Sequence, residues 1–270
     1  MLTREELRGA LRERLYSCPD VLAMWEAGSA AFDRADERSD LDIGVLARGD
    51  ALPSIWRSVE HALDDVGGFS IRWENPLHVF KGMTQRVYRP ARGRRWLDLD
   101  IGVFEETAED LYLQPQRHGR ADVLFDRSDG RRTATAQFDE VAHRRRMREA
   151  LHQEIMRWNL YRDFVAKELA RGRTIDAFGF YIAFAVRPVL TVLGMLHRPD
   201  RFDYGFRYVK DELPADDVAA IERLCYVGNP GELPARVEDA NRLFVGAVEE
   251  LNRRGIQPLD AKGTDVLKAD

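Results

Sequence analysis

The sequence contains almost no cysteine and no grouping of histidines that could bind a metal. Its two cysteines, Cys18 and Cys225, stand far apart, and none of the six histidines has the spacing of a metal ligand. This pattern argues against a disulfide framework and a zinc site, and it indicates a reducing compartment. No apolar run approaches the length needed to span a bilayer, and the first residues resemble a helix start rather than a signal peptide. We therefore expect a cytoplasmic protein without a membrane partner.

An excess of positive charge is also absent. The 270-residue chain has a formal net charge of −5, which disfavours a surface that binds nucleic acid along its length. Arginines gather locally instead, at residues 86–95 and again at 144–146. A local cluster fits one phosphorylated small molecule better than a long polyanion, although a solvated helix face is the simpler interpretation of the second cluster.

The hydrophobic pattern changes near residue 136. Before it, we expect helices at 3–16 and 53–66, and strands at 21–27, 41–47, 69–73, 78–80, 86–88, 96–104 and 123–126. After it, we expect only helices, at 138–171, 174–196, 214–226 and 234–254. The predicted fold is α+β, with a small mixed-sheet domain over residues 1–136 and an all-helical bundle domain over residues 137–270.

Two pairs of aspartates stand in a repeated stretch, Asp-Leu-Asp-Ile-Gly-Val, which begins at Asp40 and again at Asp98. On an extended strand, residues i and i+2 project to the same face, so Asp40 and Asp42 lie together with Cα atoms roughly 6–7 Å apart. Asp98 and Asp100 are related in the same way. Carboxylates this close repel each other unless a cation lies between them, and hard divalent cations prefer oxygen ligands. Taken alone, each pair would be explained better by solvated aspartates at a strand edge.

A glycine and a serine close the preceding apolar stretch, with Ser29 eleven residues before Asp40. Glycine at position 28 lets the backbone approach a phosphate closely, and the serine adds a hydroxyl donor. The order of these features resembles the DNA polymerase beta superfamily of nucleotidyltransferases. In that order, an apolar strand ends in Gly-Ser, a polar spacer follows, and Asp-x-Asp lies within a second apolar strand. One defined position departs from that pattern, because Ala27 is only weakly hydrophobic.

The resemblance implies a third acid on a neighbouring strand and a reaction that depends on magnesium. The family pattern favours Asp98 as this acid, and Asp100 on the same face is the alternative. The implied site holds two Mg²⁺ ions on Asp40, Asp42 and Asp98, with Asp100 as a further candidate ligand. Gly28 and Ser29 would bind the triphosphate, and an acceptor hydroxyl would attack the α-phosphorus in line.

The helical half is similar in layout to the aminoglycoside and lincosamide nucleotidyltransferases. This similarity implies transfer of a nucleoside monophosphate, with AMP from ATP preferred over other nucleoside triphosphates, to a hydroxyl of a small molecule such as an aminoglycoside-type antibiotic. A loose match at residues 204–214 makes Lys210 a candidate contact of the triphosphate, and solvated surface charges explain Arg207 and Lys210 about as well. Glu154 and Glu168 are candidates for accepting the proton of the attacking hydroxyl or for holding a cationic acceptor, and solvated glutamates are the simpler explanation.

Two alternatives remain open. The same chemistry could act on a protein side chain or a tRNA end, as in toxin-like or modifying enzymes, and the acidic charge balance disfavours tRNA. The chain could instead bind nucleotides or a partner protein without turnover. All the expected acids are present, which argues against such a loss of activity.

Overall fold

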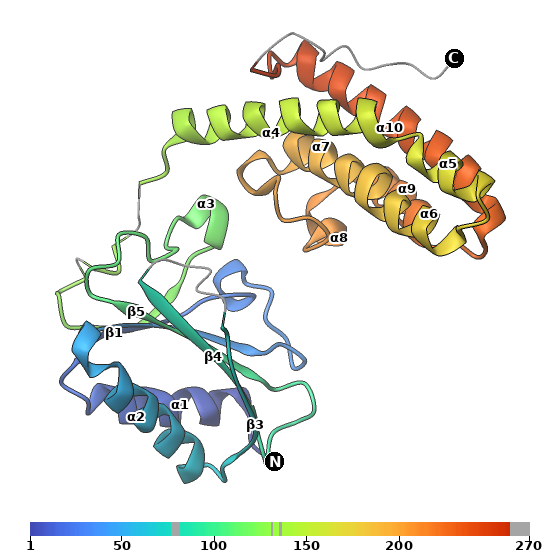
Figure 1. Ribbon diagram of the computed structural model, residues 1–270. Helices are drawn as coiled ribbons and strands as arrows, with labels where there is room; N and C mark the ends of the chain where they lie inside the picture. Colours follow the sequence, from blue (N-terminus) through green and yellow to red (C-terminus); the bar gives the residue numbers. More distant parts are fainter. Residues whose placement is uncertain (77–81, 131, 135–136, 260–270) are drawn as a thin grey trace. The chain divides into compact units, whose positions relative to one another are not determined.

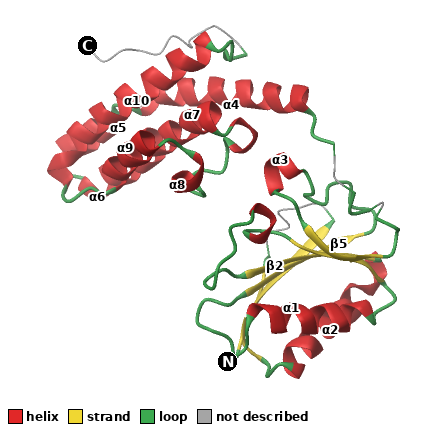
Figure 2. Ribbon diagram, turned by 180° about the vertical axis from the view of Figure 1, so that it is seen from behind, coloured by secondary structure: helices red, strands yellow, loops and turns green. Residues whose placement is uncertain are grey.

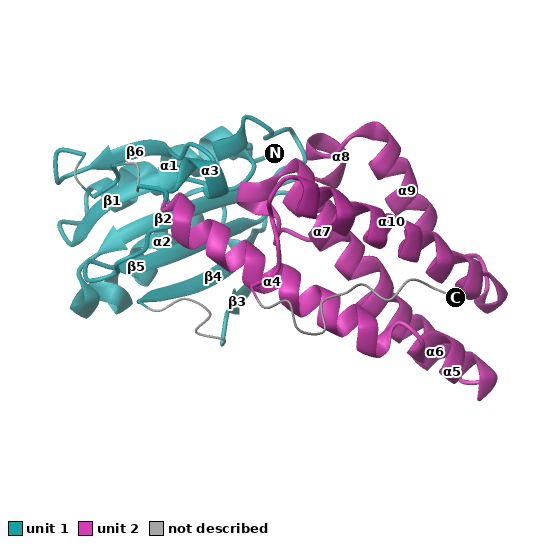
Figure 3. Cartoon of the chain, turned by 90° about the horizontal axis from the view of Figure 1, so that it is seen from above, with its two compact units in different colours: residues 1–138 teal, residues 139–270 magenta. Residues whose placement is uncertain are grey.

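The computed structural model describes residues 1–76, 82–130, 132–134 and 137–259. The chain divides into two compact units, Met1–Phe138 and Asp139–Asp270, which are coloured separately in Figure 3. All six strands belong to the first unit, and the described part of the second unit is helical (Figure 1). The predicted α+β class is therefore confirmed.

The first unit is a six-stranded mixed sheet with its two long helices on one face (Figure 1). Its elements are α1 (Arg4–Tyr16), β1 (Val21–Glu26), β2 (Leu41–Ala47), α2 (Leu52–Asp65), β3 (Phe69–Glu74), β4 (Met83–Pro90), β5 (Leu99–Glu105), α3 (Pro115–His118) and β6 (Asp122–Asp126). The strand order is β3-β4-β5-β2-β1-β6. The central pair, β2 and β5, is parallel, and every other neighbouring pair is antiparallel.

The two faces of the sheet differ in what covers them. Helices α1 and α2 lie side by side along one face (Figure 2), and their apolar residues pack on alternate residues of the strands, such as Leu41, Ile43, Leu99 and Ile101. A second, smaller cluster around Trp25, which includes Leu46 and Phe104, occupies part of the opposite face. Because strand side chains alternate between faces, the residues between the core positions of β2 and β5 belong to the face that α1 and α2 do not cover.

Helix α1 begins as the sequence predicts. The Thr3 side chain accepts a hydrogen bond from the Glu6 amide, and the Glu6 carboxylate accepts one from the Thr3 amide. This reciprocal pair satisfies two amide groups that a helix start leaves free. Leu7, Leu11 and Leu15 then point into the core at helical spacing.

The second unit is a bundle of helices around its own apolar core. Its elements are α4 (Glu140–Tyr161), α5 (Phe164–Ala170), α6 (Thr174–Tyr181), a π-helical turn (Ile182–Val186), α7 (Arg187–His197), α8 (Val209–Glu212), α9 (Ala215–Cys225) and α10 (Leu233–Arg253). Near the centre of this core the rings of Trp158 and Phe244 stack, with centroids 4.2 Å apart.

Several predicted element boundaries differ from the structure. The helix expected at 138–171 is interrupted after Tyr161, and a separate helix begins at Phe164. The strand expected at 96–104 begins only at Leu99, because residues 94–97 form a turn in which the Leu97 amide donates to the Arg94 carbonyl. The strand expected at 78–80 lies outside the described residues.

The segment Thr174–His197 corrects one expectation from the sequence. It is a helical run of 24 residues whose most apolar 18-residue stretch has a mean hydropathy of 1.7, long and apolar enough to cross a membrane by length and composition alone. The expectation that no apolar run reaches this length was wrong, because only Asp176 and Arg187 interrupt it. More than half of its most apolar stretch is buried inside the unit, as is typical of the core helix of a bundle.

Candidate functional site

The two aspartate pairs stand side by side at the start of the two central strands. In the parallel pairing of β2 with β5, Asp42 is opposite Asp100 and Leu41 is opposite Leu99. The Leu41 amide donates a hydrogen bond of 2.8 Å to the carbonyl oxygen of Asp98. The residues that precede the two strands, Asp40 and Asp98, are therefore joined through the backbone as well.

Alternation along the strands places Asp42 and Asp100 on the face that α1 and α2 leave uncovered. Leu41 and Ile43 on either side of Asp42 are buried against the helices, whereas Asp42 itself is half-buried. Asp100 is also half-buried, between the buried Leu99 and Ile101. The two carboxylate-bearing positions thus adjoin each other at one place on one face of the sheet.

Strand β4 supplies partners for the two acids that precede or begin β5. Asp98 accepts two hydrogen bonds from the guanidinium group of Arg89, 2.8 Å from Nε and 2.7 Å from Nη2. The hydrogen bonds and the charge of Asp98 raise the pKa of Arg89. Asp100 accepts from the amide group of Gln85, at 2.7 and 3.0 Å. Asp98, the third acid favoured from the sequence, is therefore in a bidentate ion pair. Asp100, the alternative, accepts hydrogen bonds from a neutral amide.

The predicted metal ligands do not form a closed set of side chains in this structure. Within residues 1–76, 82–130, 132–134 and 137–259, no group of three or more histidine, cysteine, aspartate or glutamate side chains is gathered closely enough to hold a metal ion. The structure brings Asp42 and Asp100 to facing positions and directs Asp98 to Arg89. Metal binding through Asp98 would require this carboxylate to exchange part of its contact with Arg89 for the ion.

Gly28 packs directly against the Asp42 carboxylate. Its φ angle is +60°, and a Cβ atom at this position would lie 1.8 Å from Asp42 Oδ2 and 2.4 Å from its Cγ. The neighbouring Ala27 amide donates to the carbonyl oxygen of Asp42 at 2.9 Å. Both the backbone conformation and the contact require glycine here, so the Gly-Ser loop and the Asp-x-Asp strand form one local structure.

Ser29 begins a short 3-10 turn, Ala30–Phe32, and does not cap it with its side chain. Its Oγ atom is buried and has no hydrogen-bond partner among the residues that the structure describes. A buried hydroxyl without a partner loses its hydration without compensation, so it is suited to receive a polar group from a ligand. This observation fits the role assigned to Ser29 from the sequence.

The site candidates of the helical half are placed differently. Lys210 lies on the short helix α8 of the second unit, where its side chain is exposed. Glu168 is buried and forms ion pairs with Arg171 and Arg173, an arrangement that accounts for it structurally. Glu154 is largely buried, with its Oε2 atom unpartnered among the described residues, and its pKa is raised by burial against the opposing effect of Arg157.

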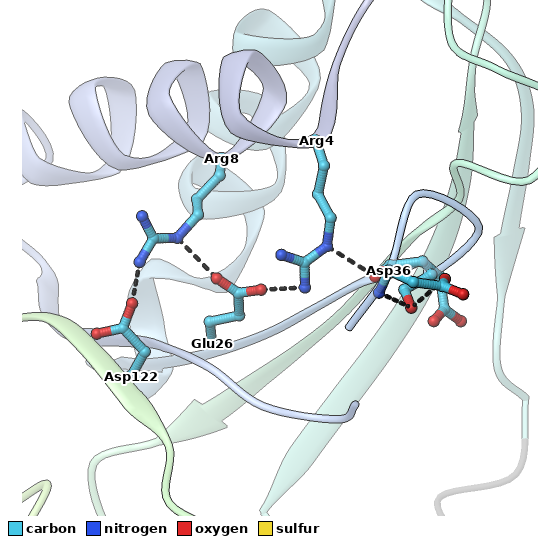
Figure 4. Close-up of polar contacts among 7 residues, drawn as sticks. Arg4, Arg8, Glu26, Asp36 and Asp122 are labelled. Carbon is cyan, nitrogen blue, oxygen red and sulfur yellow. Dashed lines mark hydrogen bonds and ion pairs between the residues drawn. The ribbon is translucent and has the colours of Figure 1, made fainter. Parts of the chain in front are cut away.

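Four residues that the sequence did not single out form an ion-pair chain around the buried carboxylate of Glu26 (Figure 4). Glu26, at the end of β1, lies between the guanidinium groups of Arg4 and Arg8, and Arg8 also pairs with Asp122. The only signal in the sequence was an acid at the end of an apolar strand. Its arginine partners come from a helix with an ordinary amphipathic pattern, so no spacing rule could have found them.

A cavity of about 360 Å³ lies beside the loop that leads into Asp40. Both signs of charge line it, with Arg4 and Arg94 as the cationic residues and Glu5, Asp36 and Glu37 as the anionic ones. None of the predicted metal or triphosphate ligands lines this cavity. The mixed lining does not select an anion or a cation.

Comparison with known proteins finds similarity only at the level of structure. No protein-family model and no curated protein matches the chain. Among solved structures, it is similar to an aminoglycoside 6-adenyltransferase from Bacillus subtilis, with 12% identity and a TM-score of 0.32 over 97% of this chain and 95% of the other. It is also similar to a nucleotidyltransferase-like protein from Exiguobacterium sibiricum, with 11% identity and a TM-score of 0.35 over 93% and 77% of the two chains. Similarity at this level carries no argument about mechanism.

Proposed function

We propose that this protein is a nucleotidyltransferase that transfers a nucleoside monophosphate from a nucleoside triphosphate to a hydroxyl group. The observation that supports this function most directly is the contact between Gly28 and the Asp42 carboxylate, with Asp100 opposite on the neighbouring strand. This contact joins a phosphate-type loop to two facing acids on the side of the sheet that α1 and α2 leave uncovered. A purely structural pair of aspartates would not need a glycine with positive φ against it.

In this proposal the acids hold Mg²⁺ and the loop holds the triphosphate. Asp40, Asp42 and Asp98 are the proposed ligands of two ions, with Asp100 as an alternative to Asp98. When bound, Mg²⁺ neutralises phosphate charge and makes an attacking hydroxyl easier to deprotonate. Ser29 contributes its unpartnered hydroxyl to a phosphate oxygen, and the Gly28 backbone leaves room for that oxygen to approach.

The finer assignments extend this proposal. We propose ATP as the donor, a small hydroxyl-bearing molecule of the aminoglycoside type as the acceptor, Lys210 as a further triphosphate contact and the cytoplasm as the location. Glu154 is the better of the two glutamate candidates for receiving a cationic acceptor or a proton, because its carboxyl is largely buried and its one ion pair among the described residues is with Arg157. Glu168 is the weaker candidate, because three basic residues already surround it.

The experiment that tests the proposal is transfer of label from α-labelled nucleoside triphosphates in the presence of Mg²⁺. Aminoglycosides, lincosamides and bulk tRNA serve as acceptors. Asp42→Asn should abolish transfer and leave the melting temperature within a few degrees of the wild type. Asp64→Asn is the matched control, since Asp64 is an exposed aspartate on α2 of the same unit. Equal activity of Asp42→Asn and wild type would refute the proposal, and transfer to tRNA alone would replace the acceptor class.

The same assay separates the two candidates for the third ligand. Asp98→Asn and Asp100→Asn are compared at a series of Mg²⁺ concentrations. The true ligand is the position at which the substitution raises the Mg²⁺ requirement at least tenfold, while the other should change it by less than threefold. Asn keeps the size of each side chain, so both variants keep an acceptor for Arg89 or Gln85.

A further inference from the structure

The carboxylate of Glu26 is one of the few charged groups that this protein buries. The residue is only 3% exposed and stands at the end of β1, next to the Gly-Ser loop. Figure 4 shows its carboxylate between two guanidinium groups from successive turns of α1: Arg4 contacts Oε1, and Arg8 Nε lies 2.7 Å from Oε2. A buried carboxylate is stable only when it is paired, and Arg4 and Arg8 supply the opposite charges here.

Arg4 makes a second contact, which leads to the proposed metal site. Its Nε atom donates a hydrogen bond of 3.2 Å to the carbonyl oxygen of Asp40. The next amide along the chain, that of Leu41, is bound to the Asp98 carbonyl. The peptide unit between Asp40 and Leu41 is therefore held at both of its polar atoms, by the ion-pair chain on one side and by β5 on the other.

The loop that leads into Asp40 is also fixed, but by its own residues. The Arg38 amide and the Ser39 hydroxyl donate to the Asp36 carboxylate, at 2.9 and 3.1 Å, and these hydrogen bonds lower the pKa of Asp36. This turn determines where the loop ends. The peptide plane after Asp40 is held at its amide by β5, and Arg4 binds its carbonyl oxygen from outside the loop.

We propose that Glu26 and Arg4 are positioning residues for catalysis, which set the direction of the Asp40 carboxylate by fixing the peptide plane between Asp40 and Leu41. This inference rests on the proposed function, in which Asp40 is a metal ligand. It assigns the ion-pair chain a role at the site in addition to joining α1 to the sheet. The guanidinium group suits this role, because its planar fork presents Nη2 to Glu26 and Nε to the carbonyl oxygen at the same time.

The structure supplies its own control for this inference. Arg8 pairs with the same buried carboxylate and with Asp122 on β6, and neither of these pairs involves Asp40. A role that is merely structural would make Arg4 and Arg8 equivalent. A positioning role would make only Arg4 important for the geometry at Asp40.

The test compares Arg4→Lys with Arg8→Lys in the full chain. Lysine keeps the charge that pairs with Glu26, but its single ammonium group cannot also reach the second acceptor in the geometry of the fork. Two quantities are measured: the affinity for Mn²⁺ in the presence of ATP, by titration, and the exchange rate of the Leu41 amide, relative to the core amide of Val45 in the same strand. Melting temperatures of the two variants are measured alongside.

Arg4→Lys should weaken Mn²⁺ binding at least tenfold and accelerate Leu41 exchange at least tenfold. Arg8→Lys should change the Mn²⁺ affinity and the Leu41 exchange rate by less than threefold. The two variants should have similar melting temperatures. Equal effects of the two substitutions, or unchanged Leu41 exchange in Arg4→Lys, would overturn the proposal. Glu26→Gln should resemble Arg4→Lys in both quantities, because the neutral amide releases the hold on Arg4.

Failure of the proposed function gives a different result. A wild-type protein that binds no Mn²⁺ with ATP would refute the metal site itself. The exchange measurement would still decide whether Arg4 fixes the Asp40–Leu41 peptide, since it reports on the hydrogen bonds of that peptide without any ligand. Faster Leu41 exchange in Arg4→Lys alone supports the positioning contact, and equal exchange in both variants contradicts it.

Discussion

At the scale of single residues, the contact between Gly28 and Asp42 joins the backbone to the proposed chemistry. Gly28→Ala would place a methyl group inside the Asp42 carboxylate and impose a left-handed backbone conformation on alanine. We expect the variant to lose more than tenfold in transfer activity, because the carboxylate must turn away from its position. We also expect a loss of about 1–3 kcal/mol in the free energy of unfolding, measured by urea denaturation.

Gly9→Ala is the control for that substitution. Gly9 lies in the middle of α1, a methyl group there would meet no neighbouring atom within 4 Å, and its φ is not positive. Alanine there should raise the free energy of unfolding by about 0.5–1 kcal/mol and leave activity unchanged. Full activity of Gly28→Ala would show that the loop does not need to approach Asp42 closely.

Glu154 gives a prediction about pH. Burial raises its pKa above the ordinary value of 4.5, and Arg157 only partly opposes this effect. The folded state therefore binds the proton more tightly than the unfolded state, so stability is lost as pH rises from 4.5 through the folded pKa, and is unaffected below 4.5. Glu154→Gln mimics the protonated form. It should raise the melting temperature of the helical unit at about pH 8, on the order of a few degrees, and have little effect at about pH 4.

The matched control is Glu149→Gln on the same helix, where the glutamate side chain is half-exposed and pairs with Arg145. This variant should show no gain at either pH, since an exposed pair of this type contributes little. Destabilisation by Glu154→Gln at the higher pH would mean that the pair with Arg157 outweighs the cost of burial.

Residue identity could be predicted from the sequence better than residue partnership. The alternation rule could relate Asp40 to Asp42 and Asp98 to Asp100, because strand periodicity is a local property, but it could not predict that Asp42 lies opposite Asp100. The pairing of Asp98 with Arg89 depends on which strand lies next to β5, and the pairing of Glu26 with Arg4 depends on how α1 crosses the sheet. Those contacts are set by tertiary packing, which single-sequence patterns do not contain.

At the scale of elements, β1 and β2 fit together through a large residue opposite a small one. Trp25 pairs with Gly44, and a Cβ atom on Gly44 would lie 2.2 Å from Cε2 of the indole. Trp25 is 2% exposed, so the ring cannot move aside without disturbing the cluster around Phe104. Gly44→Ala should therefore lower the free energy of unfolding of the first unit by about 1–3 kcal/mol, measured by urea denaturation.

Gly102→Ala on β5 is the comparison for Gly44→Ala. Its added methyl group would meet Met83 Sδ at 2.9 Å, and a half-buried, flexible methionine can adjust. We expect Gly102→Ala to lower the free energy of unfolding by less than half as much as Gly44→Ala. A larger cost for Gly102→Ala than for Gly44→Ala would contradict the idea that the indole is the rigid partner.

Element type was predictable where periodicity was long, and boundaries were not. Helix α10 begins and ends within one residue of the prediction, because its apolar spacing continues throughout. The break between α4 and α5 was missed because the apolar pattern continues through Tyr161 and Phe164 without a proline or glycine. Strand β4 is longer than predicted, because its arginines and polar residues do not show an apolar strand pattern. Its full length is set by pairing with β3 and β5.

At the scale of the whole molecule, the two units have separate cores. The apolar cluster of the helical unit contains no described residue before Met147, and the clusters of the sheet unit contain none after Phe125. Each core is closed within its own unit, so each unit has the buried apolar surface that a cooperative transition requires. We expect the full chain to unfold in two separable transitions.

Paired core substitutions test this expectation. Leu151 and Leu63 are both fully buried, the first in the helical core and the second under the sheet. Leu→Ala at either position should cost about 2–5 kcal/mol, because it removes packing and leaves a cavity. Leu151→Ala should shift only the transition followed by signals from the helical unit, and Leu63→Ala only that of the sheet unit, as measured by amide exchange under increasing urea. A single transition that moves in both variants would mean that the two cores unfold as one cooperative structure despite their separation in the sequence.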